Sequence, residues 1–265
     1  MASTPFLHTL RSRASCLLGK PDLQTQIVRE LHRALALDQS GFPDRVVLPD
    51  SYGKGMPERT VEILVARLTY APGKNVLDVG YANTMECHRA MVALLPLPRH
   101  LTGIDIAEPV YDAARYYEHM AQADVTRTPF NDATFDLIWC VSALEHFGMD
   151  NSGYIEQFSQ APAMDAQAVR EMFRILAPGG QLLITVPYGR FEDHKTHKNY
   201  DRDHWQPLLD IARPVSRVRE WYFRHTHGHG WRQVSAEELQ YVGYFDQANA
   251  GAGGVAVTLM TKAYL

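Results

Sequence analysis

Between residues 57 and 188, short apolar runs alternate with segments of helical periodicity, and this alternation constrains the fold more than any other feature. The apolar runs lie at 75–80, 101–106, 135–141 and 181–187. The run FDLIWCV (135–141) is apolar throughout, which is typical of a strand buried on both faces. Helices are expected over 84–95, 109–119 and 165–177. The alternation predicts parallel strand–helix–strand units and an α/β fold.

The flanking regions follow other patterns. In QTQIVRELHRALAL, the residues Ile27, Leu31, Leu35 and Leu37 recur at near-helical spacing. Two late apolar runs, 215–223 and 254–265, lack a helical crossover between them and predict a terminal antiparallel hairpin. We therefore expect an N-terminal helical lid and linker, an α/β domain, and insertions on the substrate side of that domain. The lid and linker are expected over 1–56 and the α/β domain over 57–265, with the insertions at 188–214 and 224–253.

Composition restricts the partners and the compartment. The net charge is −4, so no global cationic field collects nucleic acid or anionic lipid. Three cysteines suit a reducing cytoplasm, and no apolar run reaches the roughly 20 residues that span a bilayer. Residues 1–21 have the composition of a transit peptide, with Arg11, Arg13 and Lys20. We favour an amphipathic first helix there and a cytoplasmic location; the residues along one side of that helix are Phe6, Leu10, Leu17 and Leu18.

Acidic residues close the first two predicted strands. In VLDVGYANT (76–84), Asp78 and Gly80 stand at the turn into the next helix, where open α/β sheets bind ligands. In GIDIAEP (103–109), Asp105 stands at the end of the next strand, 27 residues after Asp78, and a carboxylate there can bind both hydroxyls of a ribose. The alternatives are an ordinary glycine turn at Gly80 and an exposed loop acid at Asp105.

The third motif favours one cofactor. The segment ADVTRTPFNDATFDLIWCVSALEHF (123–147) is followed by REMFRILAPGGQLLITVP (170–187). This order, D…PF…FD…LEH and then Pro-Gly-Gly, resembles the class I S-adenosylmethionine-dependent methyltransferases over roughly residues 57–188. The resemblance implies a three-layer Rossmann-like fold with a seven-stranded, mostly parallel sheet and the expected terminal hairpin. It also implies S-adenosylmethionine as the cofactor.

The resemblance further implies the residues of the cofactor site. Asp78, Gly80 and Tyr81 would lie at the methionine end, and Ser142 would form the floor beside the methionine moiety. The ribose and adenine contacts would come from Asp105, Ile106, Asp124 and Val125. The segment before the first strand would close over the carboxylate end of the cofactor through Tyr52, Arg59 or Glu62.

The glycine loop departs from the family pattern. Ala82 and Thr84 stand where the family usually has glycines, although GYANT resembles a variant of this loop. The departure leaves open a non-catalytic protein that uses the cofactor fold to bind a partner. A nicotinamide-dependent oxidoreductase is disfavoured, because the chain lacks a glycine-rich phosphate loop.

Methyl transfer to a hydroxyl requires a base or a metal. His146 follows the fourth strand and is the expected base, with His194 or His197 as substitutes; packing beside the cofactor is the alternative for His146. Six histidines fall within 194–229, but their spacing matches no zinc motif, so we expect no metal.

The acceptor is expected to bind after the fifth strand. That segment mixes aromatic faces with cations, as suits a sugar ring, and the expected substrate residues are Tyr188, Arg190, Tyr200 and Trp205. The stretch YDRDHW is loosely similar to bacterial methyltransferases of polysaccharide or natural-product biosynthesis. We expect O-methylation of a sugar or glycosylated metabolite, with N- or C-methylation of another small metabolite as the alternative. Nucleic acid and membrane are not expected partners, and a homodimer stays open.

Overall fold

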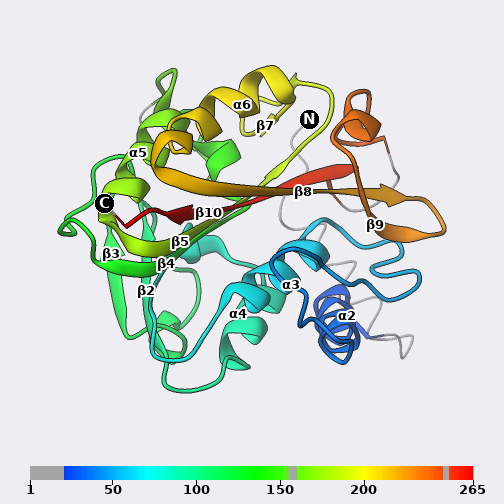
Figure 1. Ribbon diagram of the computed structural model, residues 1–265, viewed down its shortest axis with the longest axis horizontal. Helices are drawn as coiled ribbons and strands as arrows, with labels where there is room; N and C mark the ends of the chain where they lie inside the picture. The colour runs from blue at the N-terminus through cyan, green and yellow to red at the C-terminus, as the bar shows by residue number, and fades with distance from the viewer. Residues whose placement is uncertain (1–20, 154, 156–159, 247–250, 265) are drawn as a thin grey trace.

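The protein is built on one eight-stranded sheet, as seen in a computed structural model that describes residues 21–153, 155, 160–246 and 251–264 (Figure 1). The strand order is β3-β2-β1-β4-β5-β10-β8-β9. The strands are β1 (Asn75–Val79), β2 (His100–Asp105), β3 (His119–Gln122), β4 (Phe135–Val141), β5 (Leu176–Pro187), β8 (Ser216–Thr226), β9 (Gly230–Val234) and β10 (Gly254–Lys262). A separate two-stranded sheet pairs β6 (Glu192–Asp193) with β7 (Lys198–Asn199).

The strand directions confirm a mostly parallel sheet that ends in antiparallel strands. β1 pairs in parallel with β2 and β4, and the parallel pairing continues to β3 and β5. β10 is antiparallel to both β5 and β8, as the two late apolar runs predicted. The expected count of seven strands is wrong by one. The difference is β9, which pairs antiparallel with β8 after a tight turn through Gly228, where φ is +78°.

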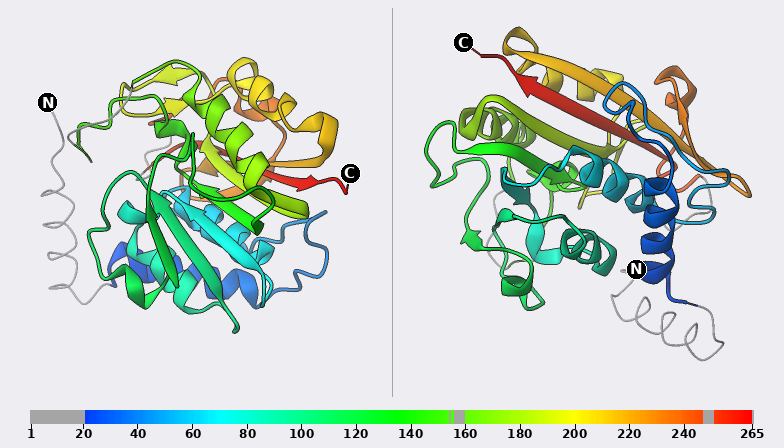
Figure 2. Two further views of the ribbon diagram at one scale, coloured as in Figure 1. Left: turned by 90° about the vertical axis from the view of Figure 1, so that its left-hand side faces the viewer. Right: turned by 60° about the horizontal axis from the view of Figure 1, so that its bottom comes forward.

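Helices cover both faces of the sheet, which gives three layers (Figures 1 and 2). One face carries α2 (Leu23–Leu35), α3 (Arg59–Thr69) and α4 (Glu86–Ala93), and the other carries α5 (Met164–Ile175) and α6 (Arg202–Asp210). Each face has its own buried apolar cluster. The short 3₁₀ turns are η1 (Tyr81–Asn83), η2 (Ala113–Arg115), η3 (Leu144–His146), η4 (Arg213–Val215) and η5 (Glu237–Leu239).

The helix expected over 109–119 is wrong, since only the turn η2 forms there. Tertiary contacts of the tyrosines in this segment prevail over local helix propensity. The Tyr111 hydroxyl donates to the Tyr81 carbonyl at 2.7 Å, and the Tyr117 hydroxyl donates to Asp78 at 2.6 Å. These bonds hold the segment against the turn after β1.

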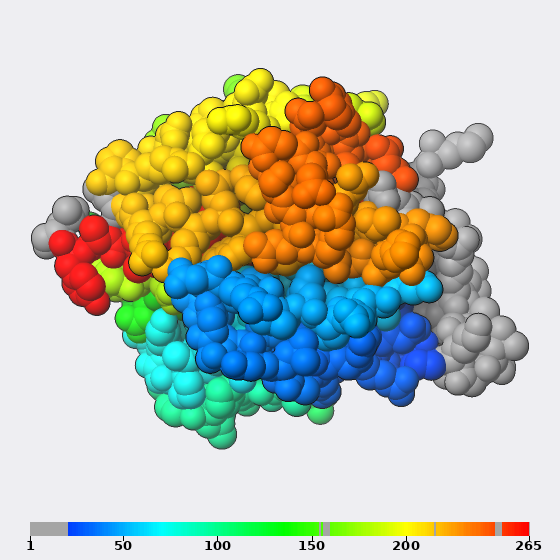
Figure 3. Space-filling view, turned by 45° about the vertical axis from the view of Figure 1, so that its right-hand side comes forward, coloured from blue at the N-terminus to red at the C-terminus, as the bar shows by residue number. Residues whose placement is uncertain are grey.

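Residues 21–56 pack into the domain beside the hairpin of β8 and β9. The Trp231 backbone N–H donates to the Tyr52 carbonyl at 2.7 Å, and its indole N–H donates to the Met56 carbonyl at 3.0 Å. Figure 3 shows the two segments side by side on one face of the molecule. A lid role for this region stays a prediction, and the targeting-like pattern of 1–20 lies outside the described residues.

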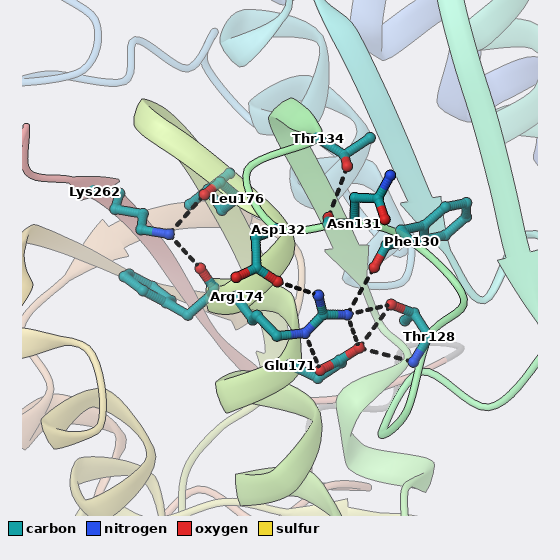
Figure 4. A network of polar contacts seen from close by, with 10 residues as sticks. Thr128, Phe130, Asn131, Asp132, Thr134, Glu171, Arg174, Leu176 and Lys262 are labelled. Carbon is teal, nitrogen blue, oxygen red and sulfur yellow. Dashed lines mark hydrogen bonds and ion pairs between the residues drawn. The ribbon is translucent and has the colours of Figure 1, made fainter.

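A polar network fixes the connection between β3 and β4 to helix α5 (Figure 4). Arg174 pairs with Glu171 and Asp132 and also donates to the Phe130 carbonyl at 2.9 Å. Glu171 accepts from both the backbone N–H and the hydroxyl of Thr128. The network therefore holds the loop that begins at the carboxyl end of β3.

Among the described helices, none is both long and apolar enough to cross a membrane.

Candidate active site

Two adjoining cavities lie where β1, β2, β3 and β4 end. Their volumes are about 350 Å³ and about 210 Å³. The two cavities share part of their lining, so they form one cleft, and the shared residues are Gly80, Asp105, Ile106, Phe147 and Asn151. Open α/β sheets bind ligands at this edge, next to the point where the strand order reverses between β1 and β4.

Asp105 lies at the centre of the cleft, at the end of β2. Its carboxylate accepts from the backbone N–H of Ala82 at 3.0 Å and from that of Ala107 at 2.9 Å. Burial raises the pKa of this carboxyl, and the two backbone hydrogen bonds act in the opposite direction. The bonds fix the carboxylate between the ends of β1 and β2, where it can accept from neighbouring hydroxyls.

The larger cavity also contains the residues that follow β3. Asp124 and Val125 line it together with Ile106. One carboxylate oxygen of Asp124 accepts from the Thr126 N–H at 2.8 Å, which orders the loop locally. The structure therefore gathers Asp105, Ile106, Asp124 and Val125 around one space, and their contact with the nucleoside part of a cofactor stays a prediction.

Gly80 allows the turn after β1 to approach the floor of the cleft. Its φ is +83°, and a Cβ atom here would come within 2.9 Å of the Ala143 Cβ. Thr84 has φ of −61°, and Ala82 is not among the described residues with positive φ. The loop therefore requires glycine only at Gly80, so the missing later glycines are no obstacle to its conformation.

Ser142 forms part of the wall of the smaller cavity, just after β4. Its φ is +50°, a conformation that non-glycine residues adopt only under tertiary constraint. Thr185 supplies that constraint by accepting from the Ser142 N–H with its hydroxyl oxygen at 3.0 Å and with its carbonyl oxygen at 3.2 Å. The Ser142 hydroxyl then donates to Glu145 at 2.9 Å.

Arg59 brings the one guanidinium that lines the smaller cavity in the described part of the chain. It lies in the first turn of α3, where it pairs with Glu62 at 3.4 Å and donates to the Val141 carbonyl at 3.3 Å. Its Nε atom is buried and has no hydrogen-bond partner among the described residues. This donor is suited to an incoming carboxylate. Tyr52, by contrast, is buried with its hydroxyl bonded to the Thr60 carbonyl.

His146 lines the smaller cavity at the end of η3. Its Nδ1 lies 2.7 Å from the Thr196 carbonyl oxygen, so Nδ1 carries the hydrogen. Burial lowers the pKa of the imidazole, which favours the neutral ring with Nε2 as the proton acceptor.

Rings from the segments after β5 and η5 continue outward from His146. Its ring centroid is 5.8 Å from that of His197, which in turn lies 4.8 Å from His194 and 4.7 Å from Tyr244. Burial, with the neighbouring imidazoles, lowers the pKa of His197 to about 4. His197 therefore lies next to His146, and His194 lies on the far side of His197 as its direct neighbour. No group of three or more histidine, cysteine or acidic side chains suited to a metal occurs among the described residues.

Asp78 and Tyr81 do not face the cleft, which corrects the prediction for both. Asp78 is buried on the side of α4, where it bonds to His88 at 2.8 Å and to Tyr117 at 2.6 Å. The reason is strand alternation: Asp78 lies on the opposite face of β1 from Leu77 and Val79. The ring of Tyr81 packs onto Gly103 and Tyr117.

The expected substrate residues also lie away from the cleft. Tyr200 and Trp205 are buried in the core under α5 and α6, with the Tyr200 hydroxyl bonded to Asp165. Arg190 is half exposed and pairs with Glu192 at 2.6 Å. Tyr188 lines a separate cavity of about 190 Å³. Aromatic residues of a core and of a substrate site look alike in sequence, and burial separates them here.

Several lining residues were missed. Phe147, Gly148 and Asn151 follow η3, Met164 begins α5, and Asn83 and Thr84 follow Gly80. The positions of Asn83 and Thr84, in the loop after β1, carried a signal, whereas neither position nor residue type marked Asn151 and Met164.

The cleft fits a nucleoside with a charged amino-acid end. Asp105 and Asp124 offer acceptors around the larger cavity, and Arg59 offers a buried, unpartnered donor in the smaller one. Gly80 leaves the space between them free of a Cβ atom. The residues present therefore suit S-adenosylmethionine.

The chain is similar to known methyltransferases over part of its length. Residues 77–184 match a family model described as a methyltransferase domain. The chain is 29% identical over 116 residues to Probable tRNA methyltransferase 9B of Mus musculus, covering 43% of this chain and 22% of that protein. It is 26% identical over 135 residues to the 27-O-demethylrifamycin SV methyltransferase of Amycolatopsis mediterranei, covering 48% and 43%. The chain thus matches less than half of the length of either relative.

The fold is shared with solved structures. The crystal structure of the cyclase SpnF aligns with a TM-score of 0.51 at 18% identity, covering 78% of this chain and 82% of that one. That likeness concerns the fold alone. Residues 77–184 therefore match a methyltransferase domain, and they lie on the Rossmann-like α/β fold described above. The match to this domain and the lining of the cleft both indicate S-adenosylmethionine as the cofactor.

Proposed function

We propose that the protein transfers the methyl group of S-adenosylmethionine to a hydroxyl oxygen of a small molecule, with His146 as the general base. One observation carries the proposal. The cleft that brings Asp105 and Asp124 together is continuous, through shared lining residues, with the smaller cavity that contains His146. The site for a nucleoside and a candidate base therefore open onto one another.

The chain's own residues have distinct tasks in this reaction. When bound, the cofactor supplies an electrophilic methyl group on a sulfonium. Asp105 would accept from the ribose hydroxyls, and Arg59 would pair with the carboxylate of the methionine part. His146 is held by Thr196 with Nε2 as the acceptor nitrogen, so it can take the proton from an acceptor hydroxyl. Alignment and desolvation of that hydroxyl complete the chemistry.

A sugar or a glycosylated metabolite remains the proposed acceptor class on the loose similarity of YDRDHW alone. The aromatic residues first assigned to sugar stacking lie elsewhere. His197 lies next to His146 instead, and Tyr244 packs against His197. A neutral amine attacks through its lone pair and does not require a base at His146, and this difference separates N-methylation from O-methylation.

Calorimetry with S-adenosylmethionine and S-adenosylhomocysteine tests the cofactor part of the proposal. We expect micromolar to submillimolar binding, and no binding at millimolar concentration would overturn it in favour of a non-catalytic protein. A panel of sugars, phenols and amines, incubated with methyl-labelled cofactor with and without a chelator, then identifies the acceptor. Loss of labelling in His146→Ala with a hydroxyl acceptor supports the proposed base, and full labelling removes it.

An RNA acceptor is the second candidate, because one relative is named as a tRNA methyltransferase. That relative shares only 22% of its length with this chain. The net charge of −4 gives little electrostatic attraction to a polyanion. A gel-shift assay with tRNA at low salt separates the candidates, since tight binding would favour RNA over a small molecule.

A further inference from the structure

Three buried carboxyl groups and one partly buried guanidinium lie together beside the smaller cavity. We call Glu58, Arg59, Glu62 and Glu145 the Glu145 cluster. Glu62 is 0% exposed, Glu145 2% and Glu58 8%. Glu58 and Glu62 come from the start of α3, while Glu145 comes from η3 directly after β4. The cluster therefore holds three carboxyl groups and one guanidinium.

The three carboxyl groups are not equally compensated. Glu62 accepts from the Thr185 hydroxyl at 2.8 Å and pairs with Arg59. Glu58 accepts from the Ala252 N–H at 2.8 Å. Glu145 accepts from the Ser142 hydroxyl with one oxygen, and its other oxygen is buried without a hydrogen-bond partner among the described residues. One positive charge thus serves a site that can hold up to three negative ones.

The shortage of positive charge keeps protons on the cluster. Burial, and then the neighbouring Glu62 carboxylate, raises the pKa of Glu145 to about 8 and that of Glu58 to about 7. Arg59 lowers both values but does not offset the burial. The other described groups that interact with the cluster are Ser142, Thr185, Cys87, Cys140, Tyr200, Tyr244 and His146. Of these, His146 is the one that could carry a positive charge, and burial lowers its pKa and so favours the neutral ring.

We propose that the Glu145 cluster determines the preference of the site for positively charged S-adenosylmethionine over its uncharged product. The inference rests on the proposed function. Glu145 bonds to Ser142 and Arg59 is a member of the cluster, and both line the smaller cavity at its methionine end. A sulfonium in that cavity is the cation that the buried carboxylates lack. After methyl transfer the sulfur is a neutral thioether, so this attraction is lost and the product is held less tightly.

Protonation is then coupled to cofactor binding. The ionised form of Glu145 attracts a cation, whereas the protonated form does not. Because the carboxyl pKa is raised, ionisation occurs at pH 7 to 8 rather than near pH 4. The affinity for S-adenosylmethionine relative to S-adenosylhomocysteine should therefore rise with pH over that range. The two ligands share their amino and carboxylate groups, so the ratio largely cancels the ligands' own titration.

The experiment measures dissociation constants of both ligands by calorimetry from pH 6.5 to 8.5. In the wild type, we expect the affinity ratio to rise at least tenfold, because two unit charges within about 12 Å at an effective dielectric of about 20 interact by that much or more. Glu145→Gln retains an oxygen that accepts from Ser142 but carries no charge, so its ratio should be lower and independent of pH. Glu118→Gln removes a carboxylate that is 51% exposed and is the matched control. Its affinity ratio should depend on pH as that of the wild type does.

The outcomes separate this inference from the proposed function. If both ligands bind but the wild-type ratio is constant with pH and equals that of Glu145→Gln, the cluster has no role in charge preference. If neither ligand binds the wild type, both proposals fail. Should Glu145→Gln not fold, as circular dichroism would show, the wild-type series and Glu58→Gln decide, because Glu58 lies in the same cluster.

Discussion

The Nδ1 atom of His146 lies 2.7 Å from the carbonyl oxygen of Thr196. A carbonyl can only accept, so this contact selects the tautomer in which Nε2 is unprotonated. Thr196 belongs to the connection between β6 and β7, a segment that follows β5 and contributes nothing to the sheet that holds the cofactor cleft. Two separate parts of the chain therefore define the orientation of the proposed base.

His146→Ala should lower kcat for a hydroxyl acceptor by roughly 10²-fold to 10⁴-fold, the usual contribution of a positioned base. Because burial lowers the pKa of His146, the neutral form persists below pH 6.5. Wild-type kcat/KM should therefore fall only at pH values below 6.5. The measurement is a pH–rate profile of both proteins, with His227→Ala, an exposed histidine, as the control. A profile whose acid limb survives in His146→Ala would contradict the role.

Asp105→Asn should weaken S-adenosylmethionine binding by roughly 10-fold to 100-fold, because a charged acceptor within the cleft is lost. The amide oxygen still accepts from one of the two backbone N–H groups, so most of the local structure should remain. Titration calorimetry measures the change. Glu108→Gln, an exposed acid three residues later in the chain, should bind like the wild type. Equal binding by both variants would place the ribose elsewhere.

Gly80→Ala should lower the free energy of unfolding by about 1–3 kcal/mol and weaken cofactor binding. Two effects combine, a φ of +83° and a Cβ contact of 2.9 Å with Ala143. Gly73→Ala is the matched control, because Gly73 has φ of +81° but nothing within 4 Å of its added Cβ. Urea denaturation of both variants isolates the contribution of the contact. Equal losses would show that the backbone conformation alone matters.

Tyr117→Phe should lower the free energy of unfolding by about 1–3 kcal/mol, since the buried Asp78 carboxylate loses one of its two partners. Cofactor affinity should change little, because neither side chain lines the cleft. Thermal unfolding and calorimetry give the two readouts. Tyr116→Phe, a hydroxyl deletion at a more exposed neighbour, is the control. A large loss of affinity at unchanged stability would return Asp78 to the cofactor site.

Glu171→Gln should destabilise the protein more at pH 7 than in acid. Hydrogen bonds from Arg174, and then from Thr128, lower the pKa of Glu171 to about 2. A carboxyl whose pKa is lowered by folding stabilises the folded state above its unfolded pKa of about 4.3, and the effect fades as pH falls toward 2. Urea denaturation at pH 7, 5 and 3.5 should show a decreasing difference between variant and wild type. A constant difference would mean that the carboxylate charge contributes nothing.

The residues around the cleft could be predicted from the sequence when their position depends only on the end of a strand. Asp105 ends β2, and Asp124 and Ser142 follow β3 and β4 in the parallel part of the sheet, so the order of the strands brings them together. The prediction for Asp78 was wrong because Asp78 lies one residue before the end of β1, and its side chain points to the opposite face of the sheet from Leu77 and Val79. The alternation of Leu77, Asp78 and Val79 along the strand indicates which face of the sheet Asp78 occupies.

The insertions could not be predicted in the same way. Tyr200 and Trp205 combine aromatic and polar neighbours in sequence, and only the packing of α6 against α5 shows them to be core residues. The Glu145 cluster joins residues from α3 and η3 that are more than 80 positions apart. No local pattern marks carboxyl groups that become buried together through the fold.

The position of β10 has a consequence for the synthesis of the chain. β10 follows β8 and β9 in sequence, yet it lies between β5 and β8 in the sheet. Until residues 254–262 leave the ribosome, the open edge of β5 has no neighbour and the β8–β9 hairpin cannot join the parallel half. During that interval the nascent protein carries two unpaired strand edges, the state in which newly made chains are most exposed to aggregation.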